Sequence, residues 1–179
     1  MKLKGDLPRL DPEWYRDRAW VFWTHPVDQR ATGWLDEQFH FQFREILLHA
    51  QVRQWLACPI YVLMPDHVHL IWIGCRDSSD QLLATRFLRT EMNRLFAPAK
   101  LQKQAHDHVL REEERRRDVF AATWRYVAEN PERAELVEDW REYPHLGSMV
   151  PGFMGLDPRR DDFFESFWRV FNAFGARGG

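Results

Sequence analysis

The segment PIYVLMPDHVHLIWI, residues 59–73, contains two runs of branched and aromatic apolar residues separated by a proline and an aspartate. Runs of this composition predict β-strands, and Pro65-Asp66 suits a tight turn between them. We therefore expect a β-hairpin with strands over residues 59–63 and 67–73. Two histidines, His67 and His69, belong to its second strand.

Amphipathic helices are expected before and after this hairpin in the sequence. Apolar residues recur at three- and four-residue spacing over residues 34–55 and again over 82–96. An aromatic and branched run at 19–24 predicts a first strand, and residues 101–110 are expected to form a fourth. The order strand, helix, strand, strand, helix, strand predicts an α+β, ferredoxin-like fold, an antiparallel sheet with helices packed on one face.

Further helices are expected downstream of this unit. One should run from about residue 112 to 129, and a short one from 131 to about 138, since proline ends the first and can begin the second. We assign residues 1–150 to one domain and 151–179 to a C-terminal extension. We expect its aromatic helix to dock on the core, although a DNA-stacking surface or a dimer contact would use the same pattern; its residues are Phe163, Phe164, Phe167, Trp168, Phe171 and Phe174.

The composition is that of a globular protein. Hydrophobic residues make up 45% and charged residues 29% of 179 residues, which is long enough for one sizeable core. No apolar run approaches the roughly 20 residues that cross a bilayer, and the start carries no hydrophobic signal segment. We expect a cytoplasmic protein without membrane contact. Cys58 and Cys75 are too few for a four-cysteine zinc site, and we expect free thiols.

The charge is unevenly distributed along a chain whose net charge is −2. Residues 81–117 carry nine Lys/Arg against five Asp/Glu, a local charge of +4, whereas residues 118–179 carry seven against eleven, a local −4. A basic middle can follow a phosphate backbone, and a solvated helix face of mixed charge is the alternative. The candidates for phosphate contacts are Arg86, Arg89, Arg94, Arg115, Arg116 and Arg117.

His67 and His69 are two residues apart on a predicted strand, so their side chains point to the same face. Two parallel imidazoles can chelate one divalent ion, and a site completed by phosphate oxygens and water can take Mg as well as Mn, Zn, Ni or Co. Incidental histidines are the alternative, and His106 and His108 form a second pair of the same spacing. A histidine-triad hydrolase is excluded because Ile71 stands where its third histidine would be.

Tyr126 lies on the predicted third helix about 200° from Trp124, off the apolar stripe. A phenol there can act as a nucleophile if a cation stabilises the developing charge, whereas an aromatic at a helix edge is the structural alternative. Asn130 follows one turn later, so its amide oxygen can approach the same ion as a third ligand. Because Pro131 follows it, Asn130 also suits the N-cap of the next helix.

Three segments together resemble the REP-associated tyrosine transposases, a branch of the single-tyrosine HUH nucleases, in which two histidines flank a hydrophobic residue. The segments are VLMPDHVHLIW at 62–72, DHVLR at 107–111 and YVAENPERAELV at 126–137. They occur in the order expected for the family, and the resemblance spans about residues 15–150. One departure is Glu135, where the family often has glycine.

The resemblance implies that His67 and His69 bind a divalent metal, that Tyr126 is the nucleophile and that Asn130 completes the metal site. It implies a metal-dependent transesterase, using Mg or Mn, that acts on single-stranded DNA at hairpin or palindromic repeats through a covalent 5′-phosphotyrosine. No nucleotide cofactor is implied, and both a monomer and a homodimer remain open.

Two alternatives come from other classes of protein. One is a catalytically weak or inactive DNA-binding or regulatory derivative of such a transposase. The other is an RNA-recognition module on a similar sheet, which is disfavoured because the chain has no strand in which Lys or Arg precedes the glycine and aromatic residues of that motif.

Overall fold

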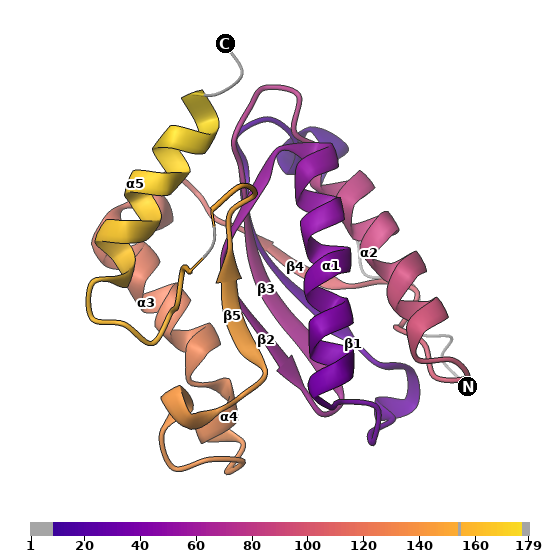
Figure 1. The fold of residues 1–179 in the computed structure, drawn as a ribbon. Coiled ribbons are helices and arrows are strands. Elements are labelled where there is room, and N and C mark those ends of the chain that lie inside the picture. The colour runs from indigo at the N-terminus through magenta and orange to yellow at the C-terminus, as the bar shows by residue number, and fades with distance from the viewer. Residues whose placement is uncertain (1–8, 154, 177–179) are drawn as a thin grey trace.

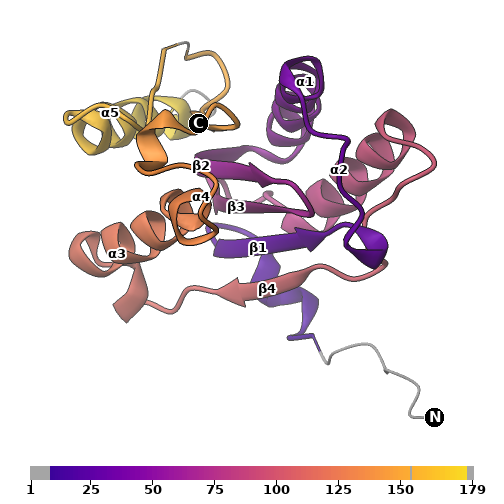
Figure 2. The ribbon, with the colours of Figure 1, turned by 90° about the horizontal axis from the view of Figure 1, so that it is seen from below.

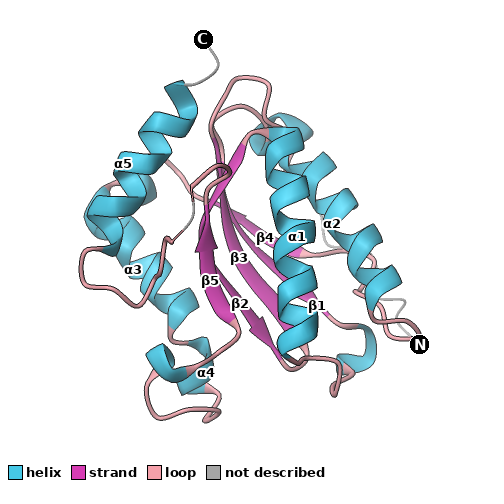
Figure 3. Cartoon of the chain, in the orientation of Figure 1, coloured by secondary structure: helices cyan, strands magenta, loops and turns pink. Residues whose placement is uncertain are grey.

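A five-stranded antiparallel sheet forms the centre of the computed structural model, which describes residues 9–153 and 155–176 (Figures 1 and 3). The strand order is β4-β1-β3-β2-β5, and its first four strands have the ferredoxin-like arrangement. The predicted α+β, ferredoxin-like class is therefore confirmed. The strands are β1 (Trp20–Pro26), β2 (Leu56–Met64), β3 (His67–Gly74), β4 (His106–Val109) and β5 (Leu146–Met149).

The β2–β3 hairpin occupies the middle of the sheet, as predicted. Met64 pairs with His67, so Pro65 and Asp66 form the turn between the strands. All nine residues of β2 are buried, and seven of the eight in β3 are buried. Helices cover both faces of the sheet, which explains why these strands have continuous apolar runs rather than an alternating pattern.

Two helices pack on one face of the sheet: α1 (Glu37–Gln54) and α2 (Gln81–Leu95) (Figure 2). Each begins at an aspartate whose carboxylate accepts hydrogen bonds from backbone N–H groups of the first turn. Asp36 accepts from Phe39, and Asp80 accepts from Leu82 and Leu83. Such caps satisfy donors that the helix itself leaves free, so the sequence marks both helix starts.

The opposite face is covered by α3 (Arg117–Ala128), α4 (Asn130–Arg133) and α5 (Phe163–Ala176) (Figure 2). The expectation of helices on one face therefore holds for the ferredoxin-like unit itself, and the later helices bury the other face. The second face needs this cover because it is also apolar: Ile60 and Ile71 of the sheet are in one buried cluster with Trp124 and Phe167.

Several predicted bounds differ from those observed. The third helix begins at residue 117 rather than about 112, because residues 113–115 form a 3-10 turn in which the Glu114 carboxylate accepts from the Arg111 N–H. The fourth strand is confined to 106–109, and the short helix ends at 133 rather than 138. The 3-10 turns are Pro12–Tyr15, Asp28–Arg30, Glu113–Arg115 and Trp140–Glu142.

The C-terminal aromatic helix is confirmed as α5, and its aromatic side chains pack on α3 and the sheet. Phe163 stacks on Trp124 with ring centroids 5.3 Å apart, and Trp168 stacks on Trp20 at 5.5 Å. Phe167 is fully buried between them. The division of the chain at residue 150 remains a prediction.

Two further expectations concern the membrane and the thiols. No helix in residues 9–153 and 155–176 is long and apolar enough to cross a membrane. Cys58 and Cys75 are both buried and free, as predicted. Burial raises the pKa of both thiols, so they stay protonated.

The packing of α5 gives the first prediction. Phe167→Ala should lower the free energy of unfolding by about 3–5 kcal/mol, because it leaves a cavity between α5 and the sheet. Phe41→Ala is the matched control, since that side chain in α1 is 67% exposed, and its effect should stay within about 0.5 kcal/mol. Urea unfolding followed by circular dichroism measures both. Equal losses would contradict the docking of α5.

Candidate active site

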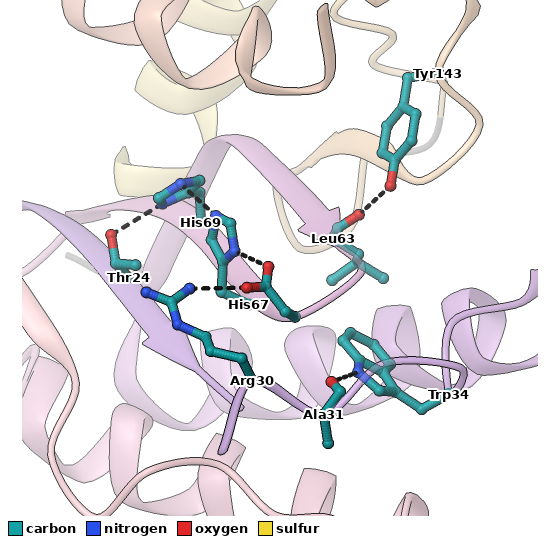
Figure 4. Close-up of polar contacts among 9 residues, drawn as sticks. Thr24, Arg30, Ala31, Trp34, Leu63, His67, His69 and Tyr143 are labelled. Atoms are coloured by element: carbon teal, nitrogen blue, oxygen red, sulfur yellow. Dashed lines mark hydrogen bonds and ion pairs between the residues drawn. The ribbon is translucent and has the colours of Figure 1, made fainter. Parts of the chain in front are cut away.

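His67 and His69 project from β3 to the same side, and their Nε2 atoms lie 3.0 Å apart (Figure 4). The two rings are nearly perpendicular, at 81°. Two nitrogens that each bind one metal ion at about 2.1 Å lie about 3.0 Å apart when they occupy neighbouring octahedral positions. The spacing of these nitrogens therefore fits a shared divalent ion.

The other nitrogen of each imidazole has its own partner. His67 Nδ1 lies 2.5 Å from Asp66 Oδ1, and His69 Nδ1 lies 2.9 Å from Thr24 Oγ1 (Figure 4). Arg30 Nη1 donates to the second oxygen of Asp66 at 3.0 Å. Partners of this kind orient metal-binding histidines in proteins, because they hold the ring and leave Nε2 for the ion.

Burial keeps His69 in its neutral form. The pKa of His69 is lowered to about 3, chiefly by desolvation and also by its cationic surroundings, Arg133 among them, while a side-chain hydrogen bond with Asn130 acts in the opposite sense. A neutral imidazole is the form that binds a metal. The electrostatic environment of His69 is therefore suited to a ligand.

Asp66 stays ionised beside His67. Its burial raises the pKa, but the hydrogen bonds and charges of His67 and Arg30 outweigh that effect, so that the pKa lies below its ordinary value. An ionised carboxylate accepts hydrogen bonds only, and His67 Nδ1 must then donate its proton to it. His67 Nε2 is the ring nitrogen that faces His69 Nε2.

Tyr126 is exposed on α3, off the apolar stripe, as predicted. Its side chain is 53% exposed, whereas Trp124 and Val127 of the same helix are buried. The Tyr126 ring packs edge-on against Phe22 with centroids 6.3 Å apart, and Phe22 also contacts the His69 ring at 5.4 Å. The phenol thus lies beside the histidine pair, separated from it by one aromatic ring.

Asn130 also lies beside His69, but it is not the N-cap of α4. The N-cap position of α4 belongs to Glu129, whose side chain makes no capping bond, so the capping interpretation of Asn130 is wrong. Asn130 Nδ2 instead donates to the carbonyls of Tyr126 and Val127, at 3.0 and 3.2 Å. Because both amide hydrogens face the end of α3, the amide oxygen is the atom left to interact with His69.

The donor set available to a metal consists of the two imidazoles and this amide oxygen. Within residues 9–153 and 155–176, no three His, Cys, Asp or Glu side chains gather around one point. An octahedral ion held by His67, His69 and Asn130 would take its other ligands from water or from phosphate oxygens, as ions that assist phosphoryl chemistry commonly do. These residues therefore fit a divalent metal.

The second histidine pair lies on the same face of the sheet, two strands away. Thr24 pairs with His69 on one side and with His106 on the other, so β1 separates the two histidine pairs. Two strand spacings amount to about 9.6 Å, which is too far for a shared ion. His108 Nε2 is held by Glu114 Oε1 at 2.7 Å.

The six candidate arginines do not form one surface. Arg86, Arg89 and Arg94 belong to α2 on one face of the sheet, whereas the group at 115–117 lies at the start of α3 on the other. Arg94 pairs with Glu91 at 2.6 Å. On the other face, Arg116 pairs with Asp118 at 3.7 Å, and Arg115 Nε donates to the Leu110 carbonyl.

Arg133, which has no role in the predicted site, lies next to the phenol. Its guanidinium carbon stands 4.2 Å from the centroid of the Tyr126 ring, and the same group donates to the Tyr126 carbonyl. The spacing of seven residues, two helical turns, was the available signal. Thr24 had no such signal, because only the pairing of β1 with β3 brings it to His69.

Comparison with known proteins supports this fold. No protein-family profile and no curated protein matches the sequence. Among solved structures, the chain is similar to a REP-associated tyrosine transposase bound to a REP hairpin, with a TM-score of 0.62 over 98% of this chain and 92% of that one. The likeness is one of fold. The sequence identity is 14%, so the likeness assigns no role to individual residues.

Metal binding provides the second prediction. Thr24→Val should lower the affinity for Mn²⁺ by about 10–100-fold, because it removes the partner of His69 Nδ1, and His67→Ala or His69→Ala should lower it further. His108→Ala is the control and should leave the affinity unchanged. Isothermal titration calorimetry measures all four variants. An undiminished affinity in the double variant His67→Ala/His69→Ala would place the ion elsewhere.

Proposed function

We propose that the protein is a metal-dependent single-stranded DNA transesterase, a transposase or nicking-and-joining enzyme that acts at hairpin or palindromic repeats. The observation that carries the proposal is the convergence of the histidine pair of β3 with the exposed phenol of α3 and the amide of Asn130 on one face of the sheet. The fold likeness to a transposase bound to a hairpin supports DNA as the partner.

The reaction exchanges one phosphodiester for another. Tyr126 Oη attacks the phosphorus, the Oη–P bond forms and the P–O3′ bond breaks. The phenol proton passes to solvent, and the leaving 3′ oxygen takes up a proton. The products are a 5′-phosphotyrosine and a free 3′-hydroxyl, which can attack the phosphotyrosine to rejoin strands. Because each step conserves the number of phosphoester bonds, no nucleotide cofactor is needed.

The side chains divide the work of this reaction. An Mg or Mn ion, when bound by His67, His69 and Asn130, would polarise the phosphate under attack. Asp66 and Thr24 hold the two imidazoles in place through Nδ1. The exposure of the phenol leaves its oxygen accessible to a DNA strand, and its place on a helix limits the positions that this oxygen can take.

Arg133 acts on the nucleophile itself. A guanidinium against the face of an aromatic ring restrains the ring and favours negative charge nearby. During the attack, negative charge develops on the phosphate oxygens and moves away from the phenol oxygen. A cation held beside these atoms stabilises the transition state. The contact of Arg133 with the Tyr126 carbonyl fixes the position of this cation.

The third prediction tests the nucleophile. Labelled single-stranded hairpin DNA incubated with the protein and Mg²⁺ or Mn²⁺ should give an adduct that resists denaturation. Tyr126→Phe and EDTA should each abolish the adduct, because one removes the attacking oxygen and the other the ion. Tyr143→Phe is the control, since its hydroxyl donates to the Leu63 carbonyl outside the site (Figure 4).

One outcome of this assay would overturn the proposal. If hairpins from the host's own repeats bind but never form the adduct, the chain is a regulatory DNA-binding derivative rather than a transesterase. A persistent adduct in Tyr126→Phe would contradict the assignment of the nucleophile.

The fourth prediction concerns Arg133. Arg133→Gln should slow adduct formation in single-turnover experiments by about 10–100-fold, because it removes the cation beside the phenol. Arg133→Lys should retain more activity, since it keeps the charge. Arg125→Gln, a change on the same side of the molecule without contact to the Tyr126 ring, is the control. Equal slowing by the Gln and Lys variants would contradict a role for the charge.

A further inference from the structure

A cavity of about 470 Å³ lies on the face of the sheet opposite the candidate active site. Its walls come from β1, from α2, from the segment before the first 3-10 turn and from the stretch before β4. His25 belongs to it because side chains alternate along β1: Thr24 faces the histidine pair, whereas His25 stacks on Trp23 in the core beneath α2.

The lining of this cavity is cationic. Arg9, Arg86 and Arg89 contribute guanidinium groups to it, and no Asp or Glu of the described residues lines it. Arg9 Nε lies 3.8 Å from Asp107 Oδ1, and Arg89 donates to the Lys103 carbonyl. Several cations around one hollow repel each other, and a bound anion would relieve that repulsion.

Two buried polar atoms in the wall have no hydrogen-bond partner among the described residues: His25 Nε2 and Thr85 Oγ1. The two residues are only 2% and 8% exposed. A buried polar atom without a partner costs about 1–3 kcal/mol, so a ligand oxygen that reached either atom would recover that cost. Both can donate: the hydroxyl carries a hydrogen, and one tautomer of the neutral imidazole carries it on Nε2.

The imidazole of His25 is neutral. Its pKa is lowered to about 3, chiefly by burial and also by the charges of Arg9 and Arg89. Both arginines line the cavity together with His25. The cavity therefore combines neutral donors in its wall with cations around them, and no carboxylate of residues 9–153 and 155–176 lines it.

We propose that this cavity binds a phosphate group. A phosphate presents acceptor oxygens in every direction and carries the negative charge that the arginines require, and guanidinium groups match its geometry. The volume falls within the range of sites for small molecules, so a phosphate with an attached sugar also fits. None of the residues that line the cavity is among those proposed to hold the metal ion or to attack the phosphate.

The phosphate has two possible sources, the backbone of the DNA strand or a free phosphate compound, and the backbone source rests on the proposed function. β1 carries Thr24 on one face and His25 on the other, and β4 is the edge strand beside it. A DNA strand that reaches both sites passes around this edge. The cavity then anchors the strand at a distance from the phosphodiester under attack.

The test of the phosphate chemistry uses inorganic phosphate and the full chain in EDTA at constant ionic strength. Phosphate should shift the imidazole resonances of His25 in nuclear magnetic resonance spectra. Thr85→Val and Arg86→Gln should each weaken binding about tenfold, because each removes a donor from the cavity. Thr90→Val and Arg94→Gln are the matched controls on the same helix, and neither residue lines the cavity.

No shift at His25, or the same affinity in the cavity variants and the controls, would overturn the proposal. Tyr126→Phe should bind phosphate as the unmodified chain does. Phosphate binding without any DNA adduct would therefore count against the proposed function alone, and an adduct without phosphate binding would count against the cavity alone.

The second arm distinguishes the two sources. The affinity for fluorescent single-stranded DNA, measured by anisotropy in EDTA across salt concentrations, should depend less steeply on salt in Arg86→Gln, with a slope reduced by about 0.7 for one lost backbone contact. Arg94→Gln should leave the slope unchanged, since that arginine is paired with Glu91. An unchanged slope in both, with phosphate binding intact, assigns the cavity to a free phosphate compound and overturns the backbone source.

Discussion

The pairing of β3 with β1 and β2 is the interaction on which the rest of the structure depends. It places the central hairpin between two layers of helices and buries apolar side chains on both faces. It also places His69 opposite Thr24. A shift of this register by one residue would turn the histidines to the other face and bury apolar side chains in their place, so the apolar pattern itself protects the site.

The position of the phenol depends on packing far from the histidines. Trp124 anchors α3 on the sheet through Phe163 of α5 and through its indole N–H, which donates to the Pro59 carbonyl. Two residues after this anchor, Tyr126 faces outward. The end of α3 then turns into α4, where the amide of Asn130 satisfies the last carbonyls. The aromatic C-terminal helix therefore contributes to the geometry of a site that it does not touch.

The backbone near this turn has one residue in an unusual conformation. Glu135 has a φ of 56°, in the left-handed region that glycine adopts without steric cost. This conformation belongs to the turn after α4 rather than to the candidate site. The charge pattern is likewise resolved by the fold, since the basic stretch at 81–117 is divided between the two faces of the sheet.

Local periodicity alone determined a large part of this protein. Side-chain spacing predicts the hairpin, the helices α1, α2 and α5, and the shared face of His67 and His69. The spacing is informative because it depends only on residues that are close in sequence. The exposure of Tyr126 follows for the same reason.

Only the tertiary structure decided the remaining features. β5 forms because β2 offers it a free edge, and its four residues, LGSM, carry no apolar alternation. Thr24, Arg133 and the cavity around His25 come together through pairings between distant segments. Strand register, free sheet edges and helix ends set those pairings, and periodicity along the chain does not specify them. Asn130 illustrates the difference. An asparagine before a proline suits the start of a helix, but in the fold its amide donates to a carbonyl at the end of α3.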